Sequence, residues 1–363
     1  NMSDLNKLAL KIISNGKGIL AADESTVTMT KRLEGVGVES SAENRLKFRE
    51  ILFSSKNMST CIGGVILYDE TINQKSKNLK IPEFISNKGV IPGIKVDTGA
   101  KVLASSPNEK ITEGLDGLRE RLKEYYDLGA RFTKWRAVYK ISSEFPSAQS
   151  IKSNAHALAR YAALVQEAEM VPIVEPEVLM DGSHNIDKCY QVTTNVLNEC
   201  YNELEIHKVD LKGTVLKPNM IIPGSECEDK SSAEEIAKKT LDCLKKNVPT
   251  DTIIYNSVID AAAQAGKADI ALSILEHMYK VNINRDIYTF TSVIAACDKS
   301  DDFHSALMVL DKMINDNIVL RSPPFNTIIH TAFRVGKAED AMRLYHRMLA
   351  MHVQPSIVTY TIL

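Results

Sequence analysis

The sequence predicts an α/β domain with a parallel sheet, followed by an all-α solenoid of helical repeats. Up to about residue 249, short apolar segments alternate with amphipathic helical patterns, which is typical of a parallel sheet covered by helices. From residue 250 the strand-like segments stop and a 35-residue repeat replaces them. A chain of 363 residues is long enough for two such domains, 1–249 and 250–363.

Six segments of the first domain are predicted to be strands. Each is short, apolar or β-branched, and bounded by turn residues. They lie at 18–23, 62–68, 93–97, 131–136, 171–177 and 213–219. Between them, residues 231–246 carry a 3.6-residue apolar stripe, and Ser231 with Glu234 predicts a capping box at its start. Ser40 with Glu43 predicts the same for an earlier helix.

Most of these strands end in ionisable side chains. In parallel α/β folds the carboxyl ends of the strands meet on one face, where active sites lie. Lys95, Lys134 and Lys217 are unusual because each lies within an apolar run, where burying an ammonium group is costly. Such a lysine either forms a Schiff base with a carbonyl or holds an anion such as phosphate. The alternative is an ion-pair network that has no catalytic role.

The residue types favour particular roles within this chemistry. Lys217 suits the Schiff base because carboxylates from neighbouring strands lie beside it. An iminium mechanism needs proton transfer at several steps. Candidates for this role are the carboxylates Asp23, Glu175 and Glu177. Candidates for phosphate binding or charge stabilisation are the basic residues Lys95, Arg32 and Arg136.

Composition excludes several other classes of protein. The formal net charge is -2, so the chain has no global electrostatic reason to bind nucleic acid or an anionic membrane. None of the six cysteines forms a CxxC pair, and no HExxH occurs, so we expect no metal site and reduced thiols. No apolar run reaches membrane-spanning length and no secretory signal is visible, which predicts a cytoplasmic protein. Asn1 precedes Met2, so a plastid transit peptide upstream is the alternative.

The motifs at the strand ends are specific. They read Leu20-Ala-Ala-Asp-Glu-Ser25, Cys61-Ile-Gly-Gly-Val-Ile-Leu67, Gly93-Ile-Lys-Val-Asp97, Lys134-Trp-Arg136, Val171-Pro-Ile-Val-Glu-Pro-Glu177 and Leu216-Lys-Pro-Asn-Met220. In this order they closely resemble the class I fructose-bisphosphate aldolases, from about residue 5 to 249. The resemblance implies a (β/α) barrel, no metal or other cofactor, and reversible cleavage of fructose 1,6-bisphosphate to dihydroxyacetone phosphate and glyceraldehyde 3-phosphate.

The resemblance also implies a role for each matched residue. Lys217 is implied to be the Schiff-base lysine, and Asp23 to assist carbon–carbon cleavage. Glu175 is implied to act as acid and base during iminium formation and release, and Lys134 to stabilise charge beside the Schiff base. Glu177 stays a catalytic candidate on its residue type and position. The substrate and its phosphates are implied to bind at Arg32, Lys95, Arg136 and Ser25.

The chain departs from the family after the sixth unit. The family barrel has eight strands, whereas this chain matches six of the eight units, which predicts a truncated (β/α) barrel. The seventh strand with its Ser-Gly-Gly-Gln phosphate loop, the eighth with its Ser-x-Gly-Arg segment, and the tail ending in Tyr have no counterpart, and the repeats begin in their place. We therefore expect impaired catalysis. The alternative function is a helical-repeat RNA-binding or adaptor protein that carries an inactive aldolase fragment.

The second domain resembles the pentatricopeptide repeats. Its units are 251–285, 286–320, 321–355 and a partial 356–363, and aromatic residues recur at Tyr255, Phe290, Phe325 and Tyr360. That family binds single-stranded RNA through paired positions, which here are Asn256 with Asp286, Thr291 with Arg321, and Asn326 with Ser356. Acidic residues outnumber basic ones in this domain, so RNA binding has little electrostatic support. A homo-oligomer is left open.

Overall fold

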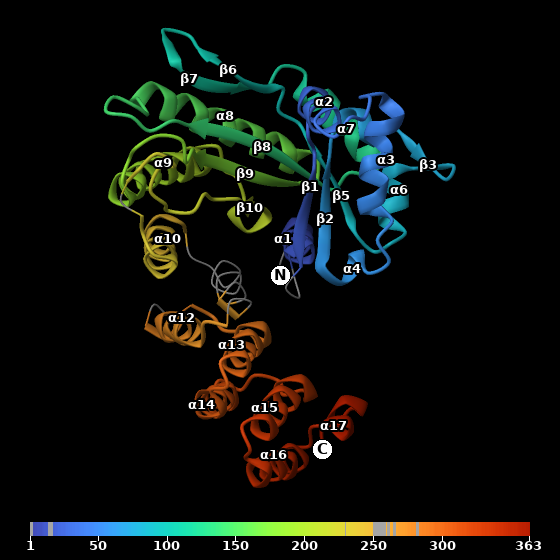
Figure 1. Cartoon of the computed structure of the whole chain (residues 1–363), viewed down its shortest axis with the longest axis vertical. Coiled ribbons are helices and arrows are strands. Elements are labelled where there is room, and N and C mark those ends of the chain that lie inside the picture. Colours follow the sequence, from blue (N-terminus) through green and yellow to red (C-terminus); the bar gives the residue numbers. More distant parts are fainter. Residues whose placement is uncertain are drawn as a thin grey trace. The chain divides into compact units, whose positions relative to one another are not determined.

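A computed structural model describes residues 3–13, 17–228, 230–249, 259, 262–263, 266–280 and 283–363. The chain divides into two compact units, Asn1–Val248 and Pro249–Leu363. Figure 1 shows strands and helices together in the first unit and helices in the second. Among the described residues, no helix combines the length and the hydropathy needed to cross a membrane.

A six-stranded parallel half-barrel sheet forms the centre of the first unit, as the sequence predicts. Its strands, in spatial order, are β1 (Gly18–Ala22), β2 (Ile62–Leu67), β5 (Ile91–Lys95), β8 (Phe132–Tyr139), β9 (Val171–Val178) and β10 (Val215–Leu216). Every neighbouring pair is parallel. Two antiparallel hairpins were not predicted, and they pair β3 (Lys75–Ser76) with β4 (Leu79–Lys80) and β6 (Gly99–Leu103) with β7 (Ser106–Glu113).

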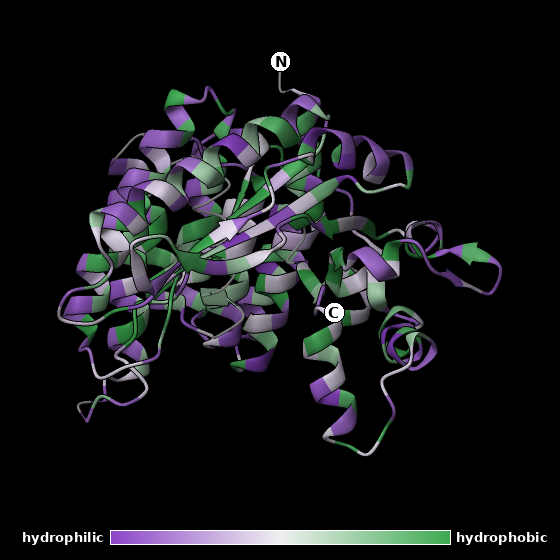
Figure 2. Ribbon diagram, turned by 90° about the horizontal axis from the view of Figure 1, so that it is seen from above, coloured by the Kyte–Doolittle hydropathy of each residue, from purple (hydrophilic) through white to green (hydrophobic). Residues whose placement is uncertain are grey.

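Helices cover the outside of this sheet (Figure 1). The longest are α8 (Ala148–Glu167) and α9 (Ile186–Ile206), which pack against each other and against β9. The remaining described helices of the unit are α1 (Asp4–Ile13), α2 (Thr26–Glu34), α3 (Ala42–Phe53), α4 (Met58–Cys61), α5 (Asp69–Ile72), α6 (Ile81–Ser86), α7 (Leu118–Asp127), the 3-10 helix η2 (Leu211–Gly213) and α10 (Ala233–Asn247). Apolar residues concentrate where helices meet strands (Figure 2).

Helix α1 packs against the strands β1, β2 and β9 of the sheet. Its residues Ala9 and Ile12 form a buried cluster with Phe132 and other strand residues. This close packing requires glycine at two strand positions. A Cβ atom at Gly63 would lie 1.8 Å from the carbonyl oxygen of Ile12, and one at Gly93 would lie 2.3 Å from the Phe132 ring.

Two predicted helix caps are wrong by one residue. Ser41, not Ser40, caps α3, and Ser232, not Ser231, caps α10. In each helix the side chain of the serine accepts a hydrogen bond from the backbone N–H three residues later. The sequence holds two adjacent serines at both places, and either serine is a favourable N-cap residue. The local conformation, not the pattern, selects the second serine.

The second unit is built from helix pairs that recur at the period of the sequence. The described helices are α12 (Ala268–Lys280), α13 (Ile287–Lys299), α14 (Phe303–Asn315), α15 (Ser322–Arg334), α16 (Ala338–Ala350) and α17 (Ile357–Ile362). The first residues of α13, α15 and α17 are 35 apart, as are those of α12, α14 and α16. The repeated Phe290 and Phe325 are fully buried, whereas Tyr360 is exposed. Tyr255 and Asn256 lie outside the described residues.

Candidate active site

Asp23, Lys134, Glu175 and Lys217 meet at the carboxyl edge of the parallel sheet. Asp23 directly follows β1, Lys134 lies on β8, Glu175 lies on β9, and Lys217 directly follows β10. The backbone N–H of Lys217 donates to the carbonyl of Val174 at 2.9 Å, which extends the pairing of β10 with β9 by one residue. The parallel register therefore brings together four residues that are far apart in the sequence.

Lys134 lies between two carboxylates in the interior of this cluster. Its Nζ donates to Oδ2 of Asp23 at 2.7 Å and lies 3.6 Å from Oε2 of Glu175. Burial alone would lower the pKa of Lys134, but the charges of Asp23 and Glu175 outweigh it and raise that pKa overall. Lys134 is thus a buried cation, suited to stabilising negative charge and not to acting as a nucleophile.

Lys217 is the accessible amine of the cluster. Its Nζ donates to Oε1 of Glu175, and its side chain is 53% exposed, whereas that of Glu175 is 2% exposed. Oε2 of Glu175 is buried and has no hydrogen-bond partner among the described residues. Glu175 therefore offers one oxygen to the Lys217 amine. Its second oxygen faces Lys134 at 3.6 Å without a hydrogen bond, so it can still accept a proton.

Arg136 and Glu177 form a second pair beside the first. Arg136 lies opposite Glu175 in the pairing of β8 with β9. Its Nε donates to Oε2 of Glu177 and lies 3.9 Å from Oε1 of Glu175. Although burial lowers it, the pKa of Arg136 is raised overall, chiefly by the hydrogen bond to Glu177. The guanidinium is half-exposed and so can reach an anionic ligand.

The other predicted phosphate-binding residues lie on neighbouring elements, each with a local partner. Lys95 contacts Oδ1 of Asp97 at 2.7 Å, and Arg32 pairs with Glu24. Ser25 is the N-cap of α2, where its hydroxyl accepts from a backbone N–H of the first turn. Within the described part of the chain, their hydrogen bonds and ion pairs do not join them to the Lys134–Glu175–Lys217 cluster.

Arg49 is a site-forming residue that the sequence analysis missed. It is fully buried on α3, where it donates to the carbonyl of Glu24 at 2.6 Å and to the hydroxyl of Thr71 at 2.7 Å. It thereby fixes the segment that follows β1 and carries Asp23. The sequence gives no signal for it, because α3 holds several charged residues and its apolar Ile51 is 74% exposed.

Two of the candidate RNA-contacting residues bond to each other. Nδ2 of Asn326 donates to the Ser356 hydroxyl at 3.1 Å, and the Thr359 hydroxyl donates to Oδ1 of Asn326 at 2.6 Å. Asn326 is 8% exposed, so these bonds lie in the packing of α15 with α17. Asp286 forms a capping box with Thr289 at the start of α13. RNA contact by these residues stays a prediction.

Comparison of the sequence with protein-family models agrees with the function that the residues at the strand ends indicate. The family model described as fructose-bisphosphate aldolase class-I matches residues 4–280. The chain belongs to the class I fructose-bisphosphate aldolase family. A second model, for pentatricopeptide repeat-containing proteins, matches residues 230–348. An aldolase-like half-barrel is thus followed in this chain by repeat sequence.

Individual fructose-bisphosphate aldolases match the chain over about two thirds of its length. A probable fructose-bisphosphate aldolase class 1 from Xanthomonas campestris pv. campestris is 52% identical over 250 residues, which cover 69% of this chain and 75% of the relative. Cytosolic fructose-bisphosphate aldolase 6 from Arabidopsis thaliana is 50% identical over 252 residues, covering 67% and 70%. The solved fructose-bisphosphate aldolase of Plasmodium falciparum matches with a TM-score of 0.67 at 40% identity, over 71% of this chain and 80% of that one.

We predict that Lys134→Met destabilises the first unit by about 3–5 kcal/mol, because it leaves Asp23 and Glu175 as buried carboxylates without their shared cation. The pKa of Lys134 is raised in the folded state, so its contribution is fully present at neutral pH and is lost only as the pH rises through that folded pKa. Urea unfolding at pH 7 therefore measures the whole effect.

The fluorescence of Trp135 is the readout, because it is the only tryptophan of the chain and is fully buried in the first unit. Lys140→Met, at an exposed position just after β8, is the matched control and should change the midpoint little. Equal midpoints for the two variants would show that the buried ion pairs do not stabilise this unit.

Proposed function

We propose that this chain is a Schiff-base aldolase that reversibly cleaves fructose 1,6-bisphosphate, with Lys217 as the nucleophile. One observation carries the proposal: the accessible amine of Lys217 donates directly to Glu175, a buried carboxylate that also contacts Lys134. A nucleophilic amine and an acid–base group within hydrogen-bond distance are what iminium formation requires. The Nζ of Lys134, 3.6 Å from Oε2 of Glu175, adds a positive charge beside the same carboxylate.

The proposed cleavage starts at the bond between Lys217 and Glu175. The amine passes one proton to Glu175 and attacks the ketone carbon. A second proton moves from the nitrogen to the ketone oxygen, which gives a neutral carbinolamine, and Glu175 then protonates the hydroxyl, which leaves as water. The resulting iminium draws electrons from the C3–C4 bond as the C4 hydroxyl gives its proton to Asp23. Glyceraldehyde 3-phosphate leaves, and Asp23 returns its proton to the enamine carbon. Hydrolysis of the iminium by water then releases dihydroxyacetone phosphate and restores Lys217 and Glu175.

The two phosphate groups of the substrate need cations at the rim of this site. Arg136 is half-exposed beside Glu175, and Lys95 lies on the adjacent strand β5. Arg32 and Ser25 lie on or next to α2, directly after Asp23 in the chain. We propose that phosphate oxygens replace the local carboxylate partners of these cations when substrate binds.

We propose a cytosolic location, supported by the similarity to the cytosolic Arabidopsis aldolase; a plastid location is the alternative. A homo-oligomer is left open.

We do not propose RNA binding as a second function. Asn326 and Ser356 bond to each other in the helix packing, and the repeat domain has no surplus of positive charge.

Borohydride trapping tests the nucleophile. Incubation with dihydroxyacetone phosphate and borohydride should reduce an iminium to a stable amine, and peptide mass spectrometry should locate the added mass on Lys217. Lys217→Met should abolish the label, because Lys134, the other lysine beside Glu175, is buried and paired with Asp23. Lys212→Met, which removes an exposed lysine five residues earlier, is the control and should keep it. A label that persists in Lys217→Met would refute the assignment.

We predict that the cleavage rate is at least about a hundredfold below that of the Arabidopsis relative assayed alongside. The resemblance implies that a phosphate loop and an arginine of the family have no counterpart here, and each charge-assisted contact contributes about 1.5–3 kcal/mol. Losing two such contacts corresponds to a factor of about a hundred or more. Lys217 also follows the last strand of the described sheet, where water reaches it.

The measurement is kcat/KM for fructose 1,6-bisphosphate, with the triose phosphates detected by a coupled assay. A value equal to that of the Arabidopsis enzyme would contradict this prediction and would mean that other residues bind the substrate phosphate. The trapping experiment is independent of this outcome, because it needs only the triose-phosphate half of the substrate.

A further inference from the structure

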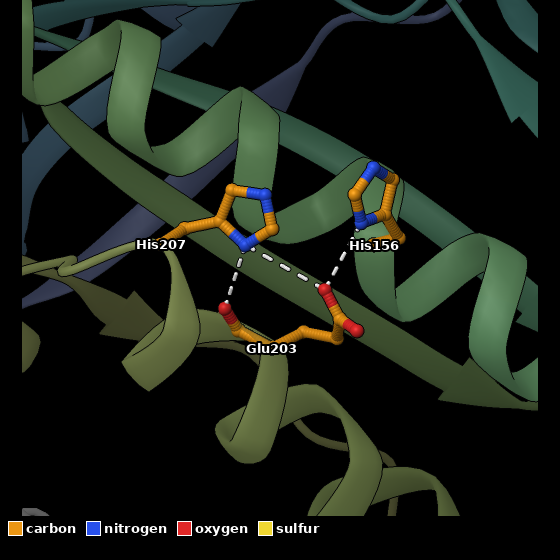
Figure 3. A group of neighbouring side chains, drawn as sticks. All are labelled: His156, Glu203 and His207. Atoms are coloured by element: carbon orange, nitrogen blue, oxygen red, sulfur yellow. Dashed lines mark hydrogen bonds and ion pairs between the residues drawn. The ribbon is translucent and has the colours of Figure 1, made fainter.

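We propose that His156, Glu203 and His207 form a binding site for a divalent transition metal ion, with Zn²⁺ as the preferred ion. His156 lies on α8, Glu203 lies in the last turn of α9, and His207 is the C-cap of α9. Figure 3 shows both imidazole rings facing the carboxylate of Glu203 from either side. One potential ligand atom from each residue lies within 4.8 Å of those of the other two.

The two distances from Glu203 to the histidines are close to the edges of a tetrahedral site. Nδ1 of His156 lies 3.0 Å from Oε2 of Glu203, and Nδ1 of His207 lies 3.5 Å from the same oxygen. Ligands held about 2.0–2.1 Å from a tetrahedral Zn²⁺ are about 3.3 Å apart. The third edge, between the two imidazole nitrogens, is within 4.8 Å, so the rings must move closer together when the ion binds. Two imidazoles and one carboxylate are a donor set that zinc accepts, with water as the fourth ligand.

The surroundings favour a cation and allow it to enter. The His156 side chain is 51% exposed, whereas Glu203 is mostly covered, so the site has one open side and a fixed carboxylate. Glu203 and His207 lie at the C-terminal end of α9, where the helix dipole is negative. Nδ1 of His207 also bonds to the carbonyl oxygen of Glu203 at 2.9 Å. A metal ion on this nitrogen replaces that bond, and water can then solvate the carbonyl.

This metal site is separate from the candidate active site. Its three residues lie on the outer helices α8 and α9, whereas Lys217 and Glu175 lie at the edge of the sheet. A bound ion would join α8 to α9, two helices that pack against each other and against β9. Metal binding to the folded state alone adds to its stability, so we expect the ion to stabilise the first unit.

Metal titration of the full-length chain tests the site. The background carries Cys61→Ser, because Cys61 is an exposed thiol that could bind zinc on its own. We expect calorimetry to show one Zn²⁺ per chain and Co²⁺ to give the visible absorption of a tetrahedral nitrogen–oxygen site. Zn²⁺ should also raise the thermal midpoint followed by Trp135 fluorescence, and Mg²⁺, which prefers oxygen ligands, should not.

Variants distinguish this site from other zinc-binding groups. His156→Asn and His207→Gln should each weaken Zn²⁺ binding at least tenfold and remove the thermal shift. His304→Gln, an exposed histidine on α14, is the matched control and should leave both unchanged. Circular dichroism of the metal-free variants confirms that they are folded. Zn²⁺ binding of equal strength in the double variant His156→Asn/His207→Gln, or no binding by the parent chain, would overturn the proposal.

Discussion

The buried carboxylate of Glu175 is the group on which the candidate active site depends. It is 2% exposed, and its two oxygens face Lys217 on one side and Lys134 on the other. A charge in this position is tolerated only when it is paired, so the two lysines and the carboxylate stabilise one another. Asp23 completes the cluster by pairing with Lys134. The same contacts place an amine, an acid–base group and a cation where a ketone could react.

Much of the fold of the first unit and of its candidate site could be predicted from the sequence, because parallel strands and the residues at their ends have a strong local pattern. The six strands and the lysines within apolar runs follow from alternation and residue type. The contribution of Arg49 could not be predicted, since it depends on how α3 packs over Glu24. The same holds for His156, which is 47 residues from Glu203 and meets it only because α8 packs against α9. No CxxC or HExxH spacing marks such a site.

The two units follow different physical rules. In the first, residues distant in sequence meet through sheet register, so the site uses strands spread from β1 to β10. In the second, the helices recur every 35 residues and each contacts its neighbours, so position within the repeat decides burial. Asn326 illustrates this: the sequence pattern marks it as a base-contacting residue, while its hydrogen bonds to Ser356 and Thr359 stabilise the contact between α15 and α17.

The most direct test of the central claim is the rate at which Lys217 forms its borohydride-trappable adduct when Glu175 is changed to Gln. The glutamine keeps the size of the side chain but cannot carry the proton. The account predicts that adduct formation slows at least about a hundredfold, the usual contribution of a general acid–base group. Glu167→Gln, at an exposed carboxylate on α8, should leave the rate unchanged. Equal rates in Glu175→Gln and Glu167→Gln would contradict the account.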